Sequence, residues 1–189
     1  MHKFRAQMRG FTLIELMVVV AVLAIGLMVA IPSFNETRQR SALRGAADQV
    51  VSFWANARFE ALKRNQPIKV GLVKSGDSFC MGAAIADDVG DNEACDCFTA
   101  NACDVATYPA SQSEWRRVRA PEVGNNDGDA IVINPKRGAV DDDGLWALRA
   151  PSGGPDYQLD VHISVFGRAV TCEPSSAGSK IPQFSNRRC

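Results

Sequence analysis

Hydrophobic positions follow two successive patterns in the first third of the chain. Residues 11–34 are almost continuously apolar, and residues 16–31 contain no charge, so this run is long enough for a helix to span a bilayer. Beyond Pro32 the apolar positions recur about every 3.6 residues, which predicts an amphipathic helix half over 35–66. Its apolar stripe consists of Leu43, Ala46, Ala47, Val50, Trp54, Ala57 and Ala61. We predict one continuous helix over 11–64, with Pro67 marking its end.

A different pattern begins after this helix. Short β-like runs separated by Gly, Pro, Asn and Asp predict strands at 68–73, 114–119, 130–133, 145–149, 157–165 and 169–172. In the run 157–165, Leu159, Val161, Ile163 and Val165 alternate with polar residues, as in a strand with one buried face. An antiparallel sheet packed on the helix stripe would bury both, so we predict an α+β head over 67–189. Residues 76–113 are predicted to be irregular.

One carboxylate interrupts the apolar run. Glu15 would cost about 3 kcal/mol inside a membrane, so it should have a partner. Cleavage after Gly10 would free the amine of Phe11, and one subunit's Glu15 could then pair with a neighbour's amine. A conventional secretory signal ending near Ala30 is the alternative, but it leaves Glu15 unexplained.

The charges that flank the apolar run predict its orientation. Lys3, Arg5 and Arg9 precede it, so the positive-inside rule places the N-terminus in the cytoplasm and the head outside, in an oxidising periplasm. Lys+Arg and Asp+Glu each total 21, and removal of residues 1–10 would leave a net acidic chain. This balance argues against a surface that coats nucleic acid.

The head contains six cysteines, an even number that predicts disulfides in a periplasmic protein. They are Cys80, Cys95, Cys97, Cys103, Cys172 and Cys189. Cys95 and Cys97 would point in opposite directions, so each should pair elsewhere. We favour Cys172–Cys189, with the other four paired among themselves in an order that spacing does not decide. Zinc binding by the first four is less favoured, because their spacing contains no C-x₂-C pair.

No constellation of catalytic residues is visible, so we expect neither an enzyme nor a cofactor. His162 is the only histidine beyond residue 10, and a lone strand histidine usually lies on a polar face. Calcium is the better metal candidate, through Asp127, Asp129 and the run 141–143, but the spacing fits no EF-hand loop. A solvated turn is the favoured reading, and we predict no metal.

Residues 9–15, Arg-Gly-Phe-Thr-Leu-Ile-Glu, resemble the type IV prepilin signature. The resemblance implies that residues 1–10 are a leader, which prepilin peptidase removes between Gly10 and Phe11, and that the new Phe11 amine is N-methylated. Pro32 lies where pilins commonly carry a helix-bending proline. Residues 11–34 would be the transmembrane and polymerisation helix. The chain would be a single-pass inner-membrane protein that later enters a periplasmic pseudopilus or a surface pilus with other pilin subunits.

Two further segments resemble a narrower family, the H-type (GspH) minor pseudopilins of type II secretion, which are grouped with FimT- and FimU-type minor pilins. Residues 134–138, Asn-Pro-Lys-Arg-Gly, resemble the proline–basic–glycine turn of that family, and residues 167–172 resemble its closing Gly-Arg…Cys segment. The implied function is a minor subunit that initiates or caps a type IV pilus or a secretion pseudopilus.

The alternative function is DNA binding for uptake. Its candidate residues are Arg168, Lys180, Arg187 and Arg188, which a Cys172–Cys189 bond would draw together. It is not favoured, because Val170 stands where DNA-binding FimT-type pilins carry a second arginine. A non-polymerising membrane protein with a sensory or enzymatic head is the third hypothesis, and Glu15 beside a processable Phe11 argues against it.

Overall fold

The computed structural model describes residues 11–76, 78–88, 90–108, 119–123, 129–141, 144–149, 156–178, 180–187 and 189, without the side chains of 29–33, 78 and 119–123. Within these residues the chain forms one helix followed by eight strands. It divides into two compact units, Met1–Thr37 and Arg38–Cys189. We call the second unit the head.

The helix α1 spans Leu13–Arg64 and runs through both units, so it is continuous as predicted. Its C-terminus has a Schellman cap: Asn65 adopts a left-handed φ of 52°, and the Gln66 N–H donates to the Ala61 carbonyl at 3.3 Å. Pro67 follows this cap, so the helix cannot continue.

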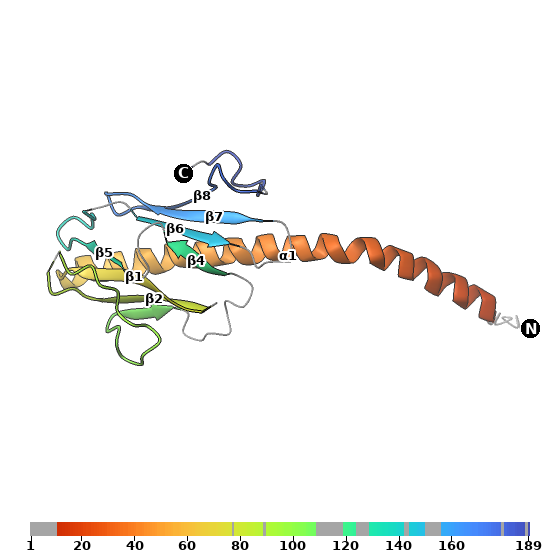
Figure 1. The fold of residues 1–189 in the computed structure, drawn as a ribbon, viewed down its shortest axis with the longest axis horizontal. Coiled ribbons are helices and arrows are strands. Elements are labelled where there is room, and N and C mark those ends of the chain that lie inside the picture. Colours follow the sequence, from red (N-terminus) through yellow and green to blue (C-terminus); the bar gives the residue numbers. More distant parts are fainter. Residues whose placement is uncertain are drawn as a thin grey trace, which may run out of the picture. The chain divides into compact units, whose positions relative to one another are not determined.

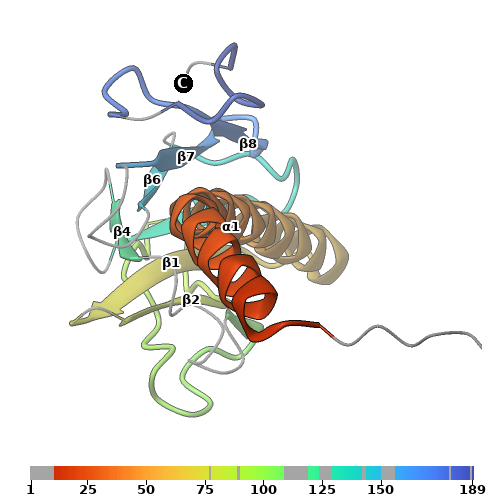
Figure 2. The same ribbon diagram turned by 90° about the vertical axis from the view of Figure 1, so that its right-hand side faces the viewer.

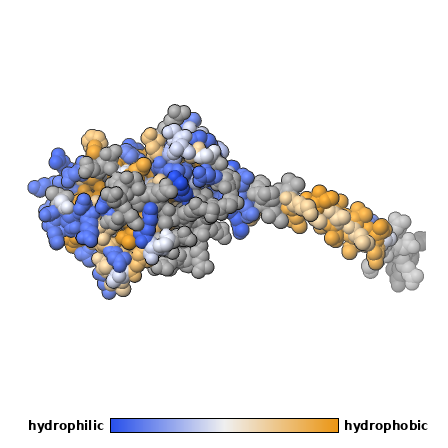
Figure 3. All heavy atoms as spheres, viewed as in Figure 1, coloured by the Kyte–Doolittle hydropathy of each residue, from blue (hydrophilic) through white to orange (hydrophobic). Residues whose placement is uncertain are grey.

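In the first unit, the apolar side chains of α1 are exposed. Leu13, Ile14 and Met28 are 78%, 67% and 75% exposed, and Figure 3 shows the apolar residues of this segment as an orange surface. Among the residues that the structure describes, no helix has an apolar stretch of the length that a membrane crossing requires.

The head contains two antiparallel four-stranded sheets (Figure 1). The first has the order β3-β2-β1-β5, with bounds β1 Ile68–Ser75, β2 Ser78–Ile85, β3 Ala106–Tyr108 and β5 Ala130–Ile133. The second has the order β4-β6-β7-β8, with bounds β4 Arg119–Val123, β6 Gly144–Arg149, β7 Gln158–Ile163 and β8 Ala169–Cys172. The α+β class predicted from the sequence is confirmed.

The core lies where both sheets pack against the head part of α1 (Figure 2). All seven residues of the predicted apolar stripe are buried, with at most 4% exposure. The indole rings of Trp54 on α1 and Trp146 on β6 meet edge to face, with centroids 5.9 Å apart, an arrangement that aromatic pairs prefer. The Trp54 Nε1–H also donates to the Gly167 carbonyl at 3.0 Å, so the buried indole has its polar partner.

Three predictions about the strands need correction. Strands β2 and β3 lie inside the stretch 76–113 that was expected to be irregular. Val165 was assigned to a buried strand face, but β7 ends at Ile163 and Val165 is 43% exposed in the turn that follows. Asp160 was assigned to a polar, exposed face, but only 3% of it is exposed. Cys172, its neighbour on β8, and Cys189, which is bonded to Cys172, cover it. Most of the predicted strand 114–119 lies outside the described residues.

All six cysteines form disulfides: Cys80–Cys97, Cys95–Cys103 and Cys172–Cys189. The structure thus contains the Cys172–Cys189 bond that the sequence favoured, and Cys95 and Cys97 pair elsewhere. Cys80–Cys97 attaches residues 94–103 to β2, and Cys95–Cys103 closes this segment on itself over Gly71 and Gly82, which face each other on β1 and β2. A Cβ at Gly82 would lie 2.4 Å from both Sγ atoms of Cys95–Cys103, so only glycine leaves room for this cover.

Candidate functional site

The predicted assembly residues lie at the start of α1. Thr12 precedes the helix, and its Oγ1 accepts from the Glu15 N–H at 3.3 Å, while the Thr12 N–H points back to Glu15 Oε2 at 3.4 Å. This is the reciprocal geometry of a capping box, in which a threonine and a glutamate three residues later satisfy free helix amides. Glu15 therefore caps its own helix, a local role that was not among its predicted roles.

The remaining residues of this predicted site are less fully described. Gly10, and with it one side of the predicted cleavage junction, lies outside the described residues, as does the whole leader. Phe11 precedes the helix and is 83% exposed. Pro32 lies within α1, and its side chain is not described.

Among the described candidates for DNA binding, Arg168 and Arg187 lie toward opposite ends of β8. Arg168 directly precedes β8. Arg187 lies near the opposite end of this strand, where the Arg187 carbonyl accepts a hydrogen bond from the Glu173 N–H at 2.8 Å. Five residues of extended chain separate the two positions along the strand, roughly 16 Å at about 3.3 Å per residue. The Cys172–Cys189 bond is present, but it returns the C-terminal segment to the end of β8 that is distant from Arg168.

The charge of Lys180 is partly neutralised. Its Nζ lies 3.9 Å from Oε2 of Glu173, and Glu173 is itself buried, with Oε1 accepting from the Ile181 N–H at 2.7 Å. Lys180 therefore helps to compensate a buried carboxylate. Arg188, the fourth candidate, lies outside the described residues.

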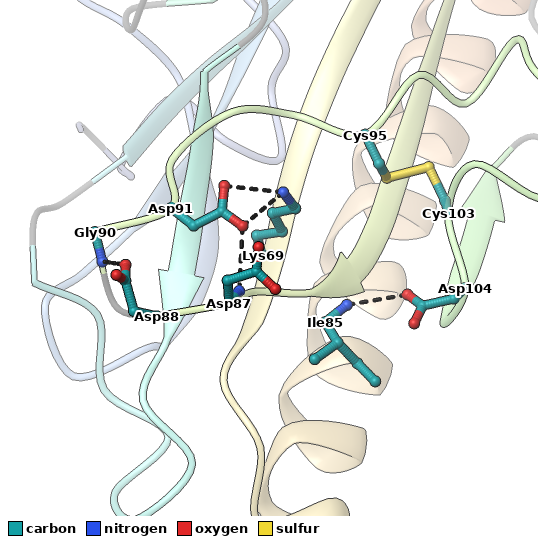
Figure 4. Close-up of polar contacts among 9 residues, drawn as sticks. All are labelled: Lys69, Ile85, Asp87, Asp88, Gly90, Asp91, Cys95, Cys103 and Asp104. Atoms are coloured by element: carbon teal, nitrogen blue, oxygen red, sulfur yellow. Dashed lines mark hydrogen bonds and ion pairs between the residues drawn. A yellow bond between two sulfur atoms is a disulfide. The ribbon is translucent and has the colours of Figure 1, made fainter.

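Two carboxylates, Asp91 and Asp104, hold the chain directly before and after the cysteine-rich cover of residues 94–103 (Figure 4). Lys69 Nζ lies 2.9 and 2.8 Å from the two oxygens of Asp91, and this pair ties the segment before the cover to β1. The hydrogen bond from Lys69, together with one from the Asp87 amide, lowers the pKa of Asp91. Asp104 accepts from the Ile85 N–H at 3.0 Å.

The candidates for metal binding and catalysis are described only in part. Within the described part of the chain, no group of three or more His, Cys, Asp or Glu residues could hold a metal ion. Asp129 and Asp141 are described, and the other calcium candidates, Asp127, Asp142 and Asp143, are not. His162 is half-buried on β7, opposite Leu145 and Val170.

Two turns that carry the narrower resemblance meet at one point of α1. Gly138 and Gly167 have φ values of 61° and 71°, and both lie against the Arg58 side chain. A Cβ at Gly167 would lie 1.9 Å from the Gly138 carbonyl oxygen, so the two turns touch through backbone. Next to this contact, α1 and residues 167–169 enclose a groove of about 360 Å³. Sequence reasoning missed the groove, although Phe59 and Leu62 already formed an apolar pair outside the main stripe.

Two family models match the chain. The prokaryotic N-terminal methylation motif matches residues 5–31. The model of the type II transport protein GspH matches residues 46–167, more than half of the chain, from the head part of α1 to the β7–β8 turn. The chain belongs to the GspH family.

This family assignment states the role of the chain in general terms. GspH proteins are structural pseudopilin subunits and are not known as enzymes, so the chain is a minor pilin or pseudopilin of a type II secretion system or pilus. The family implies assembly with other subunits and processing by prepilin peptidase. GspH proteins are typically anchored in the inner membrane by their N-terminal helix. Comparison with curated proteins and with solved structures found no match.

Proposed function

We propose that the chain is a minor subunit that initiates or caps a type II secretion pseudopilus or a type IV pilus, after cleavage between Gly10 and Phe11. Residues 11–34 anchor the precursor in the inner membrane, with the head in the periplasm, and later join the helical bundle of the polymer. The observation that carries the proposal is the methylation motif directly before a GspH domain. Glu15 adds support, because its carboxylate lies at the first helical turn, one turn from Phe11.

The processing step has a direct test. Intact-mass analysis and N-terminal sequencing of the membrane-extracted protein should give a chain that starts at N-methylated Phe11. A start near Ile31 would identify a conventional secretory signal and would refute the proposal.

Assembly tests whether Glu15 pairs with a neighbour's amine or only caps its own helix. Glu15→Gln keeps the capping geometry, since glutamine also serves at this position of a capping box, but it removes the charge that would pair with the amine. Thr12→Ala is the matched control, because it removes the cap and keeps the charge.

We expect Glu15→Gln to reduce incorporation into the polymer and Thr12→Ala to leave incorporation near wild type. Membrane insertion should be unchanged or improved in Glu15→Gln, because it removes a carboxylate from the apolar segment. The measurement is the amount of each variant that sediments with the sheared polymer. Normal incorporation of Glu15→Gln together with loss in Thr12→Ala would assign Glu15 to capping alone.

A further inference from the structure

The groove beside the β7–β8 turn has an apolar wall that runs along α1 from Val51, which packs against the core, to the exposed Phe59 and Leu62. Val51, Ala55, Phe59 and Leu62 line it from α1, and their spacing of four, four and three residues puts them on one face of the helix. Phe59 and Leu62 are 63% and 44% exposed. This stripe lies beside the core stripe of the same helix, and Arg168 and Ala169 face it across the groove.

The charged groups of the groove are both guanidinium groups. Arg58 and Arg168 contribute to its lining, which contains no carboxylate. The residues three and four positions from Arg58 on the helix are Trp54, Ala55, Ala61 and Leu62, so α1 provides it with no acidic neighbour. Within the described structure, the Arg58 Nε atom is buried and has no hydrogen-bond acceptor. A buried donor without an acceptor is uncommon in folded proteins and calls for an explanation.

The surrounding backbone is shaped around this guanidinium. A Cβ at Gly138 would lie 2.6 Å from Arg58 Nε, and one at Gly167 would lie 3.2 Å from it. Two turns in left-handed glycine conformations thus leave room for one arginine, and the hydrogen bond from Trp54 to Gly167 holds one turn in place. Arg58 is therefore fixed before any ligand arrives, which lowers the entropic cost of binding.

We propose that this groove is a docking site for another pilin-type subunit, which inserts a carboxylate side chain next to an apolar side chain. Arg58 and Arg168 bind the carboxylate, because guanidinium groups match its charge and planar geometry. Phe59 and Leu62 contact the apolar neighbour, in the manner of a segment docked along a helix groove. The inference rests on the proposed function, because it takes the partner from the same polymer.

The experiment places a photo-cross-linker on the groove of the full-length chain, expressed in its own bacterium. Benzoylphenylalanine replaces Leu62 in the groove or, as a control, Asn56, which is exposed on another face of α1. After irradiation, cross-linked partners are identified by mass spectrometry, and the attachment site in the partner is mapped. We expect the Leu62 position to cross-link to a pilin-type subunit at a segment with an acidic residue beside an apolar one, at least fivefold more than the Asn56 position.

Charge removal tests the chemistry of recognition. Arg58→Gln and Arg168→Gln should each reduce the cross-link yield at position 62 at least fivefold. Arg187→Gln, an exposed cation beyond the other end of β8, should leave it unchanged. Arg168 is exposed, so its variant should fold normally and keeps the test decisive if Arg58→Gln does not fold.

The outcomes separate the inference from the proposed function. Unchanged yield in Arg168→Gln would overturn carboxylate recognition. Equal cross-linking from positions 62 and 56, capture of proteins other than pilin-type subunits, or no cross-link from a chain that sediments with the polymer would overturn the docking site. A chain that is absent from the polymer, or that does not start at methylated Phe11, would refute the proposed function, and the inference with it.

Discussion

The contact between the two glycine turns makes a strong prediction about stability. In Gly167→Ala the new Cβ would lie 1.9 Å from the Gly138 carbonyl oxygen, a backbone atom that can move only if its whole turn moves. The residue would also have to keep a φ of 71°, which costs a non-glycine residue about 1–2 kcal/mol. If the turn that contains Gly167 moved away instead, the 3.0 Å hydrogen bond from the buried Trp54 indole to the Gly167 carbonyl would break.

The size of the effect follows from these contributions. Leaving the buried indole N–H without an acceptor costs about 1–3 kcal/mol, so the total loss in Gly167→Ala should be about 2–5 kcal/mol. Gly76 is the matched control: it has a φ of 60° and no atom near its Cβ position. Gly76→Ala should therefore lose only the conformational part, about 1–2 kcal/mol.

Urea unfolding of the full oxidised chain in detergent, followed by tryptophan fluorescence, measures both losses. With a slope of about 2 kcal/mol per molar, the midpoint should fall by roughly 1–2.5 M in Gly167→Ala and by about 0.5–1 M in Gly76→Ala. Equal midpoints for the two variants would refute the reasoning, because the clash would then be absorbed without cost.

Three further predictions concern the braces of the head. The pKa of Asp91 is lowered, chiefly by its hydrogen bond from Lys69. The pair therefore stabilises the fold above the ordinary pKa of aspartate, and this stabilisation is lost as the pH falls. Asp91→Asn should make the urea midpoint fall less between about pH 7 and pH 3. Burial raises the pKa of Asp160, so its ionisation destabilises the fold as the pH rises above the ordinary aspartate value. Asp160→Asn should therefore raise the midpoint at pH 7 more than at pH 3, and an equal effect at both would contradict the assignment. Replacing Cys172 and Cys189 by serine should cost about 3 kcal/mol in the same assay, for a closed loop of this length, and a loss under about 1 kcal/mol would mean that the C-terminal segment is held without the bond.

The parts of the fold that were predictable are those where one period covers a whole element. The stripe from Leu43 to Ala61 repeats for five turns, so its burial followed from the spacing alone. The alternation of Leu159, Val161 and Ile163 marked β7 in the same way. In contrast, β2 is buried on both faces, by the core and by the disulfide cover, so its residues do not alternate. A local signal existed in Gly82, since a glycine among strand-like residues often marks close approach of another segment.

The candidate sites were harder to predict, because they depend on register and on contacts between distant turns. The sequence favoured the Cys172–Cys189 bond, yet only the pairing along β8 places Arg168 and Arg187 at opposite ends of the strand. The groove requires Phe59, Leu62 and the β7–β8 turn to lie together, and no local pattern joins residues more than 100 positions apart. The spacing of Thr12 and Glu15 already indicates a capping box. A charge in an apolar run also indicates an ion pair, here with the Phe11 amine of a neighbouring subunit, and the spacing alone does not separate the two roles.

The facing pair Gly71 and Gly82 also restricts how β1 and β2 can pair. A hairpin that slips by two residues keeps its side chains on the same faces, so burial of apolar surface discriminates weakly against it. Such a slip would place Val73 opposite Gly82, and the two glycines would no longer form one flat area. The Val73 side chain would then lie beside Gly82 on the face that the Cys95–Cys103 disulfide covers, and the cover could not lie as close to the sheet. The cover therefore fits only the native register, so the glycine pair adds a steric constraint on strand pairing that burial of apolar surface does not provide.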